Sequence, residues 1–177
     1  MKTKFSYILI IIIYSGQLFA QYTFEKIISD PENQIINRVI EDDDGNFIMA
    51  GRIRISETEN HSGYLIKINN AGNLMEEQII TPDETISSLF LNIHFFNNHY
   101  YILGSAMVVY PDVSKLWYLK LNTNLEIEDE KLLNIPYGRW FSYMNSIIDS
   151  DSNFVITGYT SRMESSYYNS DAFFYKL

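Results

Sequence analysis

The chain has 177 residues, a formal net charge of −9 and no cysteine. An acidic chain is a poor partner for nucleic acid and for anionic membranes, and without cysteine no disulfide can form. The 14 Tyr, 11 Phe and 2 Trp, together with only 8 Gly and 4 Pro, favour β structure and exclude a disordered chain.

The first 20 residues have the layout of a secretory signal peptide. Lys2 and Lys4 form a basic start, residues 5–14 are almost continuously apolar, and small residues precede a cleavage site expected after Ala20. The apolar run of about ten residues is shorter than the roughly 20 that a transmembrane helix needs. The sequence therefore predicts an exported protein, secreted or at the cell surface, that does not span the membrane. Its mature region is residues 21–177.

A repeat with a period of about 53 residues runs through the mature region. Three kinds of block keep this period: an apolar run ending in glycine, an apolar run containing a lysine, and a mixed acidic and apolar run. Their landmarks are Gly51, Gly104 and Gly158, then Lys67, Lys120 and Lys176, then residues 24–28, 76–80 and 129–133. Because three independent blocks share one spacing, we interpret them as copies of one structural unit.

The predicted strands follow in chain order. A strand over residues 22–29 resembles the last strand of a unit, and three units follow it, at approximately residues 35–85, 86–138 and 139–177. In the first unit, strands are expected at residues 37–41, 47–54, 63–69 and 74–81. The third unit has only three strands, so the strand at 22–29 is placed to complete it.

The acidic stretch Asp42-Asp43-Asp44-Gly45-Asn46 is predicted to be the turn between the first two strands of the first unit. Asp, Asn and Gly tolerate positive φ and bond their own backbone, as tight turns require. A cation site is the alternative, but a helix-loop-helix calcium loop also needs a bidentate Glu farther on, and strand sequence follows instead. A phosphate loop would need a glycine-rich junction with lysine, which this stretch lacks.

Units of this length with four strands predict an all-β, β-propeller-like fold of about three four-stranded blades. The stretch DGNFIMAGRI…GYLIKINNAGNL resembles the repeats of secreted bacterial β-propeller proteins, which are kelch-like and associated with type IX secretion. The resemblance covers about residues 22–177. The second repeat departs from it, because Asn97-Asn98-His99 stands in place of Asp-Gly-Asn.

Three blades would leave a propeller ring open, since closed propellers typically have four to eight. We therefore expect the chain to be the front part of a longer propeller, or else to self-associate through its exposed blade faces.

Candidate site residues are few. The aromatic side chains that gather in the last third suggest a ligand platform, for which Arg139, Trp140 and Tyr143 are the best surface candidates, although packing between blades is the alternative role of such rings. His61, His94 and His99 lack matching ligands for zinc, and the carboxylates of residues 126–130 lie where a charged edge strand is expected. We find no pattern for catalytic residues, a metal or a cofactor.

These features predict a non-catalytic binding or scaffold module, secreted or at the cell surface, whose partner is an unidentified protein or glycan. Two alternatives stay open. The chain could be part of a secreted carbohydrate-active enzyme, or a lectin-like carbohydrate binder, with some functional residues in blades outside this sequence.

Overall fold

The computed structural model describes residues 33–54, 60–108, 113–135, 140–164 and 167–177, with the backbone alone for residues 140–144 and 162–169. Every strand in these ranges belongs to one of three antiparallel sheets. The first sheet contains β1 (Gln34–Glu41), β2 (Phe47–Arg54), β3 (His61–Ile68) and β4 (Leu74–Ile80), in that spatial order. The second sheet contains β5 (Thr85–Phe96), β6 (His99–Val108), β7 (Val113–Leu121) and β8 (Ile127–Leu133), also in chain order. The third sheet contains β9 (Trp140–Ile148), β10 (Phe154–Glu164) and β11 (Tyr167–Lys176), with β10 in the centre.

The predicted all-β fold and its division into four-stranded units are confirmed. The four strands expected in the first unit match β1 to β4, and the third unit contributes three strands. The predicted signal peptide, residues 1–20, and the predicted strand at residues 22–29 lie outside the described residues. None of the described ranges contains a helix long and apolar enough to cross a membrane.

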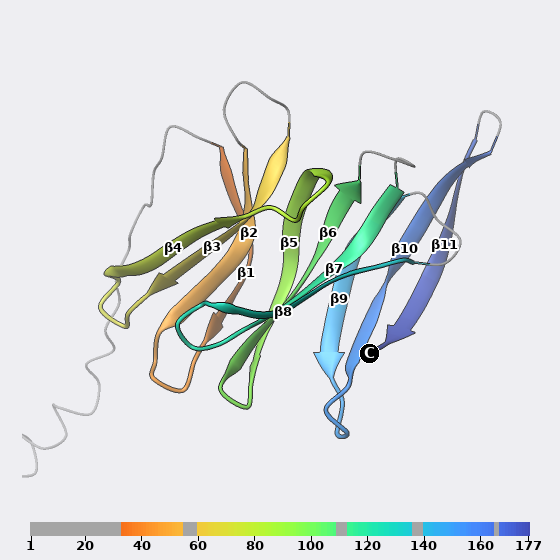
Figure 1. Cartoon of the computed structure of the whole chain (residues 1–177). Coiled ribbons are helices and arrows are strands. Elements are labelled where there is room, and N and C mark those ends of the chain that lie inside the picture. Colours follow the sequence, from red (N-terminus) through yellow and green to blue (C-terminus); the bar gives the residue numbers. More distant parts are fainter. Residues whose placement is uncertain (1–32, 55–59, 109–112, 136–139, 165–166) are drawn as a thin grey trace, which may run out of the picture.

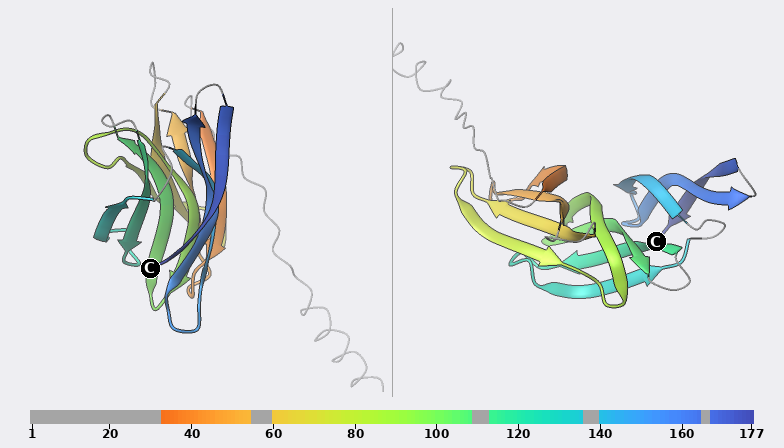
Figure 2. Two further views of the ribbon diagram at one scale, coloured as in Figure 1. Left: turned by 90° about the vertical axis from the view of Figure 1, so that its right-hand side faces the viewer. Right: turned by 90° about the horizontal axis from the view of Figure 1, so that it is seen from above.

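The three sheets stand side by side in chain order, face against face (Figures 1 and 2). The first strand of each later sheet packs against the sheet before it, so that β5 contacts β1, β2 and β3, and β9 contacts β5, β6 and β7. We call the interface between the first and second sheets the first seam, and that between the second and third sheets the second seam. This stacking of four-stranded sheets through their faces is the arrangement of propeller blades.

Each seam is filled by apolar side chains from both of its sheets. In the first seam, the rings of Phe90 and Trp117 stack at 4.6 Å and belong to one buried cluster with Ile48 and Leu65. A smaller buried cluster in the second seam contains Leu103, Leu116, Phe154 and Ile156. Strands of a sheet that is buried on both faces carry near-continuous apolar runs, and this explains the weak alternation of the sequence.

The repeated glycine lies where two strands approach closely. Gly51 pairs with Ile36 beside a β-bulge in β1, and Gly104 pairs with Phe90 beside an equivalent bulge in β5. A Cβ atom on Gly51 would lie 1.9 Å from the carbonyl oxygen of Ile35. The register of β9 against β10 shifts at Gly158 as well. The period of the glycines is therefore the period of a bulge that only glycine can face.

Candidate functional site

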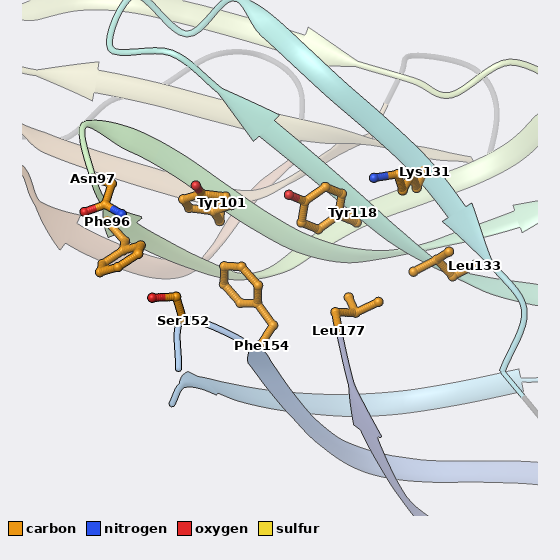
Figure 3. Close-up of a pocket in the computed structure, with 9 residues that line it drawn as sticks. All are labelled: Phe96, Asn97, Tyr101, Tyr118, Lys131, Leu133, Ser152, Phe154 and Leu177. Atoms are coloured by element: carbon orange, nitrogen blue, oxygen red, sulfur yellow. The ribbon is translucent and has the colours of Figure 1, made fainter. Parts of the chain in front are cut away.

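A pocket of about 450 Å³ opens in the second seam (Figure 3). Its walls come from the second sheet on one side and from the third sheet on the other. The lining residues are Phe96, Asn97, Tyr101, Tyr118, Lys131, Leu133, Ser152, Phe154 and Leu177. Four of these nine carry aromatic rings, so the pocket has an apolar floor with polar groups around it, as small-molecule sites usually do.

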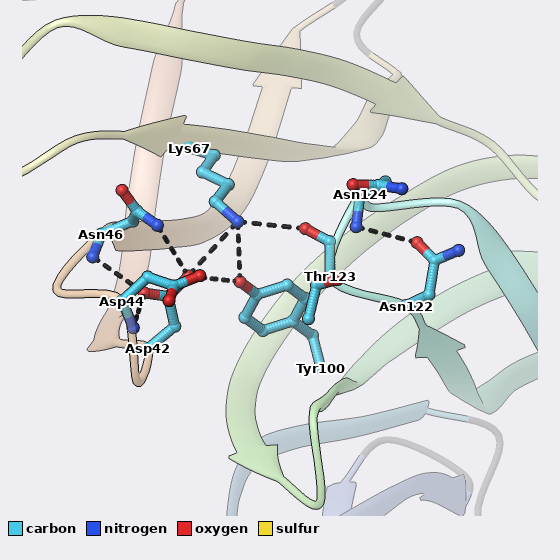
Figure 4. A network of polar contacts seen from close by, with 8 residues as sticks. All are labelled: Asp42, Asp44, Asn46, Lys67, Tyr100, Asn122, Thr123 and Asn124. Atoms are coloured by element: carbon cyan, nitrogen blue, oxygen red, sulfur yellow. Dashed lines mark hydrogen bonds and ion pairs between the residues drawn. The ribbon is translucent and has the colours of Figure 1, made fainter.

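The corresponding place in the first seam is closed by a buried polar network (Figure 4). The Tyr100 hydroxyl donates to Asp42 Oδ2 at 2.7 Å, and Lys67 Nζ lies 3.2 Å from the same oxygen. Lys67 Nζ also donates to the Tyr100 hydroxyl and to the Thr123 carbonyl, both at 3.0 Å. A charged pair is stable inside a protein only when its remaining donors and acceptors are satisfied, and these contacts satisfy them.

The Asp42 carboxylate is strongly stabilised in its charged form. Burial alone would raise its pKa, but the Tyr100 hydroxyl, the backbone and side-chain N–H groups of Asn46, and Lys67 together lower the pKa to about 2. Burial and the neighbouring carboxylate of Asp42 raise the pKa of Tyr100, so its hydroxyl remains a donor. The network therefore consists of one carboxylate, one ammonium group and one neutral phenol that hold two sheets together.

The second seam lacks this network because the second repeat differs in sequence. Phe96 occupies the place of Asp42 at the end of the first strand of its sheet, and Phe154, which has no hydroxyl, occupies the place of Tyr100. The repeated lysine, Lys120, bonds instead to Glu128 at 2.8 Å. Without an ion pair to fill the seam, a hollow lined by rings remains.

The rings of the pocket support one another and present hydroxyl groups. The Tyr101 and Phe154 rings lie 5.0 Å apart, and the Tyr118 ring lies 6.3 Å from Phe154. Burial and the charge of Asp129 raise the pKa of Tyr118 to about 12, so this hydroxyl is protonated and able to donate at neutral pH. Lys131 Nζ lies 5.4 Å above the Tyr118 ring and pairs with Asp129. The site therefore offers flat apolar faces, hydroxyl groups and one ammonium group.

The surface candidates from the sequence do not line this pocket. Arg139 lies outside the described residues. Trp140 begins β9, where its backbone pairs with Ser161, and Tyr143 lies in the same strand near the register shift; their side chains are outside the described part of the chain. The pocket lies at the opposite end of β9, where Ile148 pairs with Phe154. Sequence reasoning missed it, although the loss of Asp-Gly-Asn in the second repeat marked the right place.

The histidines of the second repeat make structural contacts. His94 Nε2 lies 2.7 Å from the Ser146 hydroxyl, across the second seam, and burial lowers the pKa of this imidazole. His99 Nε2 lies 3.1 Å from Glu128 on the exposed side. Among the described residues, no three or more His, Cys, Asp or Glu side chains gather where they could hold a metal ion.

The acidic stretch at residues 42–46 forms the turn that the sequence predicted. Asp42 Oδ1 accepts hydrogen bonds from the backbone N–H groups of Asp44 and Asn46, and Gly45 has φ of 77°. Because these bonds and the network of the first seam occupy the Asp42 carboxylate, its oxygens serve the fold.

Comparison with known proteins concerns the fold only. No known family profile and no curated protein matches the sequence. Among solved structures, the GH32 beta-fructofuranosidase of Bombyx mori is similar, with a TM-score of 0.55 and 12% sequence identity. The likeness covers 84% of this chain and 35% of the enzyme chain, so this chain spans about a third of that protein's length. The three stacked sheets and this likeness together give the chain an all-β, propeller-like fold.

Proposed function

We propose that this chain is a non-catalytic binding module, secreted or displayed at the cell surface, that holds a sugar ring in the pocket of the second seam. One observation carries the proposal: the pocket combines the faces of Tyr101, Tyr118 and Phe154 with hydroxyl, amide and ammonium groups. The C–H faces of a sugar ring pack on aromatic rings, and its hydroxyl groups need donors and acceptors close by. A pocket of about 450 Å³ has the size of known small-ligand sites.

Binding without catalysis is supported by the chemistry of the lining residues. Glycoside hydrolysis generally uses two carboxylic acids on either side of the bond that breaks. None of the nine residues that line the pocket is Asp, Glu, His or Cys. The pocket thus has groups that recognise a sugar but lacks the usual acid and base.

The rival function is a part of a larger carbohydrate-active enzyme. The similarity to a beta-fructofuranosidase favours this reading in kind, but at 12% identity it concerns the fold alone. On this reading the reacting groups would lie outside residues 1–177. Release of free sugar from fructosides by the purified chain would support the enzyme, whereas binding without release supports the module.

The binding test uses a glycan array, followed by calorimetry on any glycan that binds the purified protein. Tyr118→Ala removes a ring of the floor and should weaken binding at least tenfold, because aromatic contacts contribute about 1 kcal/mol beyond their buried area. Tyr118→Phe keeps the ring and loses the hydroxyl, so a loss of about two- to tenfold is expected.

Two further variants serve as controls. Tyr159→Ala removes a tyrosine from the opposite face of the third sheet, and binding should not change. Trp140→Ala tests the surface candidate from the sequence. Loss of binding in Trp140→Ala with none in Tyr118→Ala would place the site at the start of β9 and overturn the pocket.

A further inference from the structure

The third sheet repeats, on its outward face, the surface that the first sheet buries in the first seam. The register places Ile147, Val155 and Lys176 in one cross-strand row, and Asn145, Thr157 and Phe174 in the next. The corresponding rows of the first sheet are Ile40, Ile48 and Lys67, and Arg38, Ala50 and Leu65. We call this face of the third sheet the open face.

The same positions are covered in the first sheet and uncovered in the third. Ala50 and Leu65 are fully buried, whereas their counterparts Thr157 and Phe174 are exposed, Phe174 to 68%. Ile147 is 60% exposed. Large exposed apolar side chains that gather on one sheet face are typical of an interaction surface.

The ion pair of the first seam also recurs on the open face. Lys176 Nζ lies 2.7 Å from Asp149 Oδ2, as Lys67 lies beside Asp42. The side chain of Lys176 is 47% exposed, against 10% for Lys67. The pair lacks the covering phenol and carbonyl that Tyr100 and Thr123 of the next sheet provide to Lys67.

Within the described residues, a second copy of this chain offers no free sheet to cover the open face. Both faces of the second sheet are packed, one in each seam. On the first sheet, the residues that face away from the first seam include Ile53, Tyr64 and Ile66, which are already buried.

We propose that the open face is a docking site for a further four-stranded sheet built like the second sheet, which seats an aromatic hydroxyl and a turn carbonyl on Lys176. This partner sheet lies outside the described residues and differs from a second copy of the chain. One detail of its shape follows from the register. Ala172 occupies the place of Gly63, against which the rings of Phe90 and Trp117 pack so closely that a Cβ atom would lie 2.5 Å from Phe90. The partner must therefore carry smaller side chains at those two positions.

The test supplies such a sheet from the chain's own sequence. Residues 69–135 are fused directly after Leu177, because Leu177 corresponds to Ile68 in the repeat, and Ala172→Gly restores the space for Phe90 and Trp117. The added segment brings a fourth strand for the third sheet and a copy of the second sheet. Amine labelling read by mass spectrometry then compares Lys176 in the fused and unfused proteins.

The fused sheet should lower the labelling rate of Lys176 at least tenfold, towards that of buried Lys67, because access then requires local opening. Phe174→Asp in the fusion should restore the labelling. An unchanged rate at Lys176 in a folded fusion overturns the proposal, and so does a fusion whose added segment stays unfolded, since the open face would have supplied its missing neighbour. Light scattering on the unfused chain completes the test. A dimer that shields Lys176 would make a second copy the occupant and also overturn the proposal, whereas a monomer with reactive Lys176 supports it.

Discussion

At the scale of single residues, one turn geometry recurs with different side chains in its strained position. The turns at residues 42–46, 69–73, 122–126 and 149–153 share the same pair of backbone hydrogen bonds. Their fourth residues all have positive φ, but only two of them are glycine; the others are Leu125 and Ser152. A leucine at φ of 64° is unfavourable by about 1 kcal/mol, and Leu125 offsets this cost by burying its side chain in the first seam.

Gly51 gives a residue-scale test of the bulge. Gly51→Ala should lower the free energy of unfolding by about 3 kcal/mol or more, since the new Cβ would overlap backbone atoms that cannot move independently. Gly72→Asn is the control, because Gly72 has φ of 78° in an open turn and Asn tolerates that conformation. Chemical denaturation of both variants measures the difference. Equal stability of Gly51→Ala and the unchanged protein would mean that β1 shifts freely away from β2.

The ion pair of the first seam predicts a dependence of stability on pH. The pKa of Asp42 is about 2 in the folded protein against 3.8 for the ordinary group, so the folded state holds the charged form more strongly. The stabilisation, about 2 kcal/mol, is complete above pH ~4 and is lost as the pH falls towards 2. Asp42→Asn should destabilise the protein by about 3 kcal/mol at pH 7, because Lys67 stays buried without its carboxylate. The loss should shrink as the pH approaches 2.

Asp149→Asn is the matched control for this prediction. Asp149 starts an equivalent turn and pairs with Lys176, but on the exposed face of the third sheet. Asparagine can serve the turn itself, as Asn69 and Asn122 do. The free energy of unfolding should therefore change much less than in Asp42→Asn. Equal losses would assign the effect to the turn and not to burial between the sheets.

At the scale of strands and turns, the sequence predicted the elements that repeat and missed the consequence of one that does not. Periodic glycines and lysines placed β1 to β4 within a few residues, because every copy must face the same bulge and the same cross-strand neighbours. The turn between β5 and β6 kept its position but changed its type. It is a two-residue turn with Asn97 and Asn98 at φ of 49° and 59°, and it has no aspartate to reach across the seam.

The pocket could not be predicted from the sequence, because it depends on three substitutions whose side chains meet only after the sheets stack. Phe96, Phe154 and the redirected Lys120 belong to three different strands or turns of two sheets. Each alone looks like an ordinary change within a repeat. Their common effect, the loss of the polar network that closes the first seam, appears only when the two seams are compared.

At the scale of the whole molecule, the three sheets differ in how much packing holds them. The second sheet has a seam on each face, and the first sheet shares the larger buried cluster with it. The third sheet contributes to the smaller cluster and leaves its open face exposed, with Phe174 and Ile147 uncovered. Local opening is easiest where few apolar contacts must be broken. The third sheet should therefore open first.

Hydrogen exchange followed by mass spectrometry measures this order. Amides of β6 and β7 should exchange slowest, amides of β2 and β3 next, and amides of β10 fastest among central strands, because opening β10 breaks only the second seam. Ile156→Ala, which removes a fully buried side chain from that seam, should lower the free energy of unfolding by about 2–5 kcal/mol and speed exchange mainly in β9 to β11. Ile48→Ala is the matched variant in the first seam, where exchange of β1 to β4 should respond instead. If both variants accelerated all strands equally, the three sheets would unfold as one cooperative unit, and the difference between the seams would have no bearing on local opening.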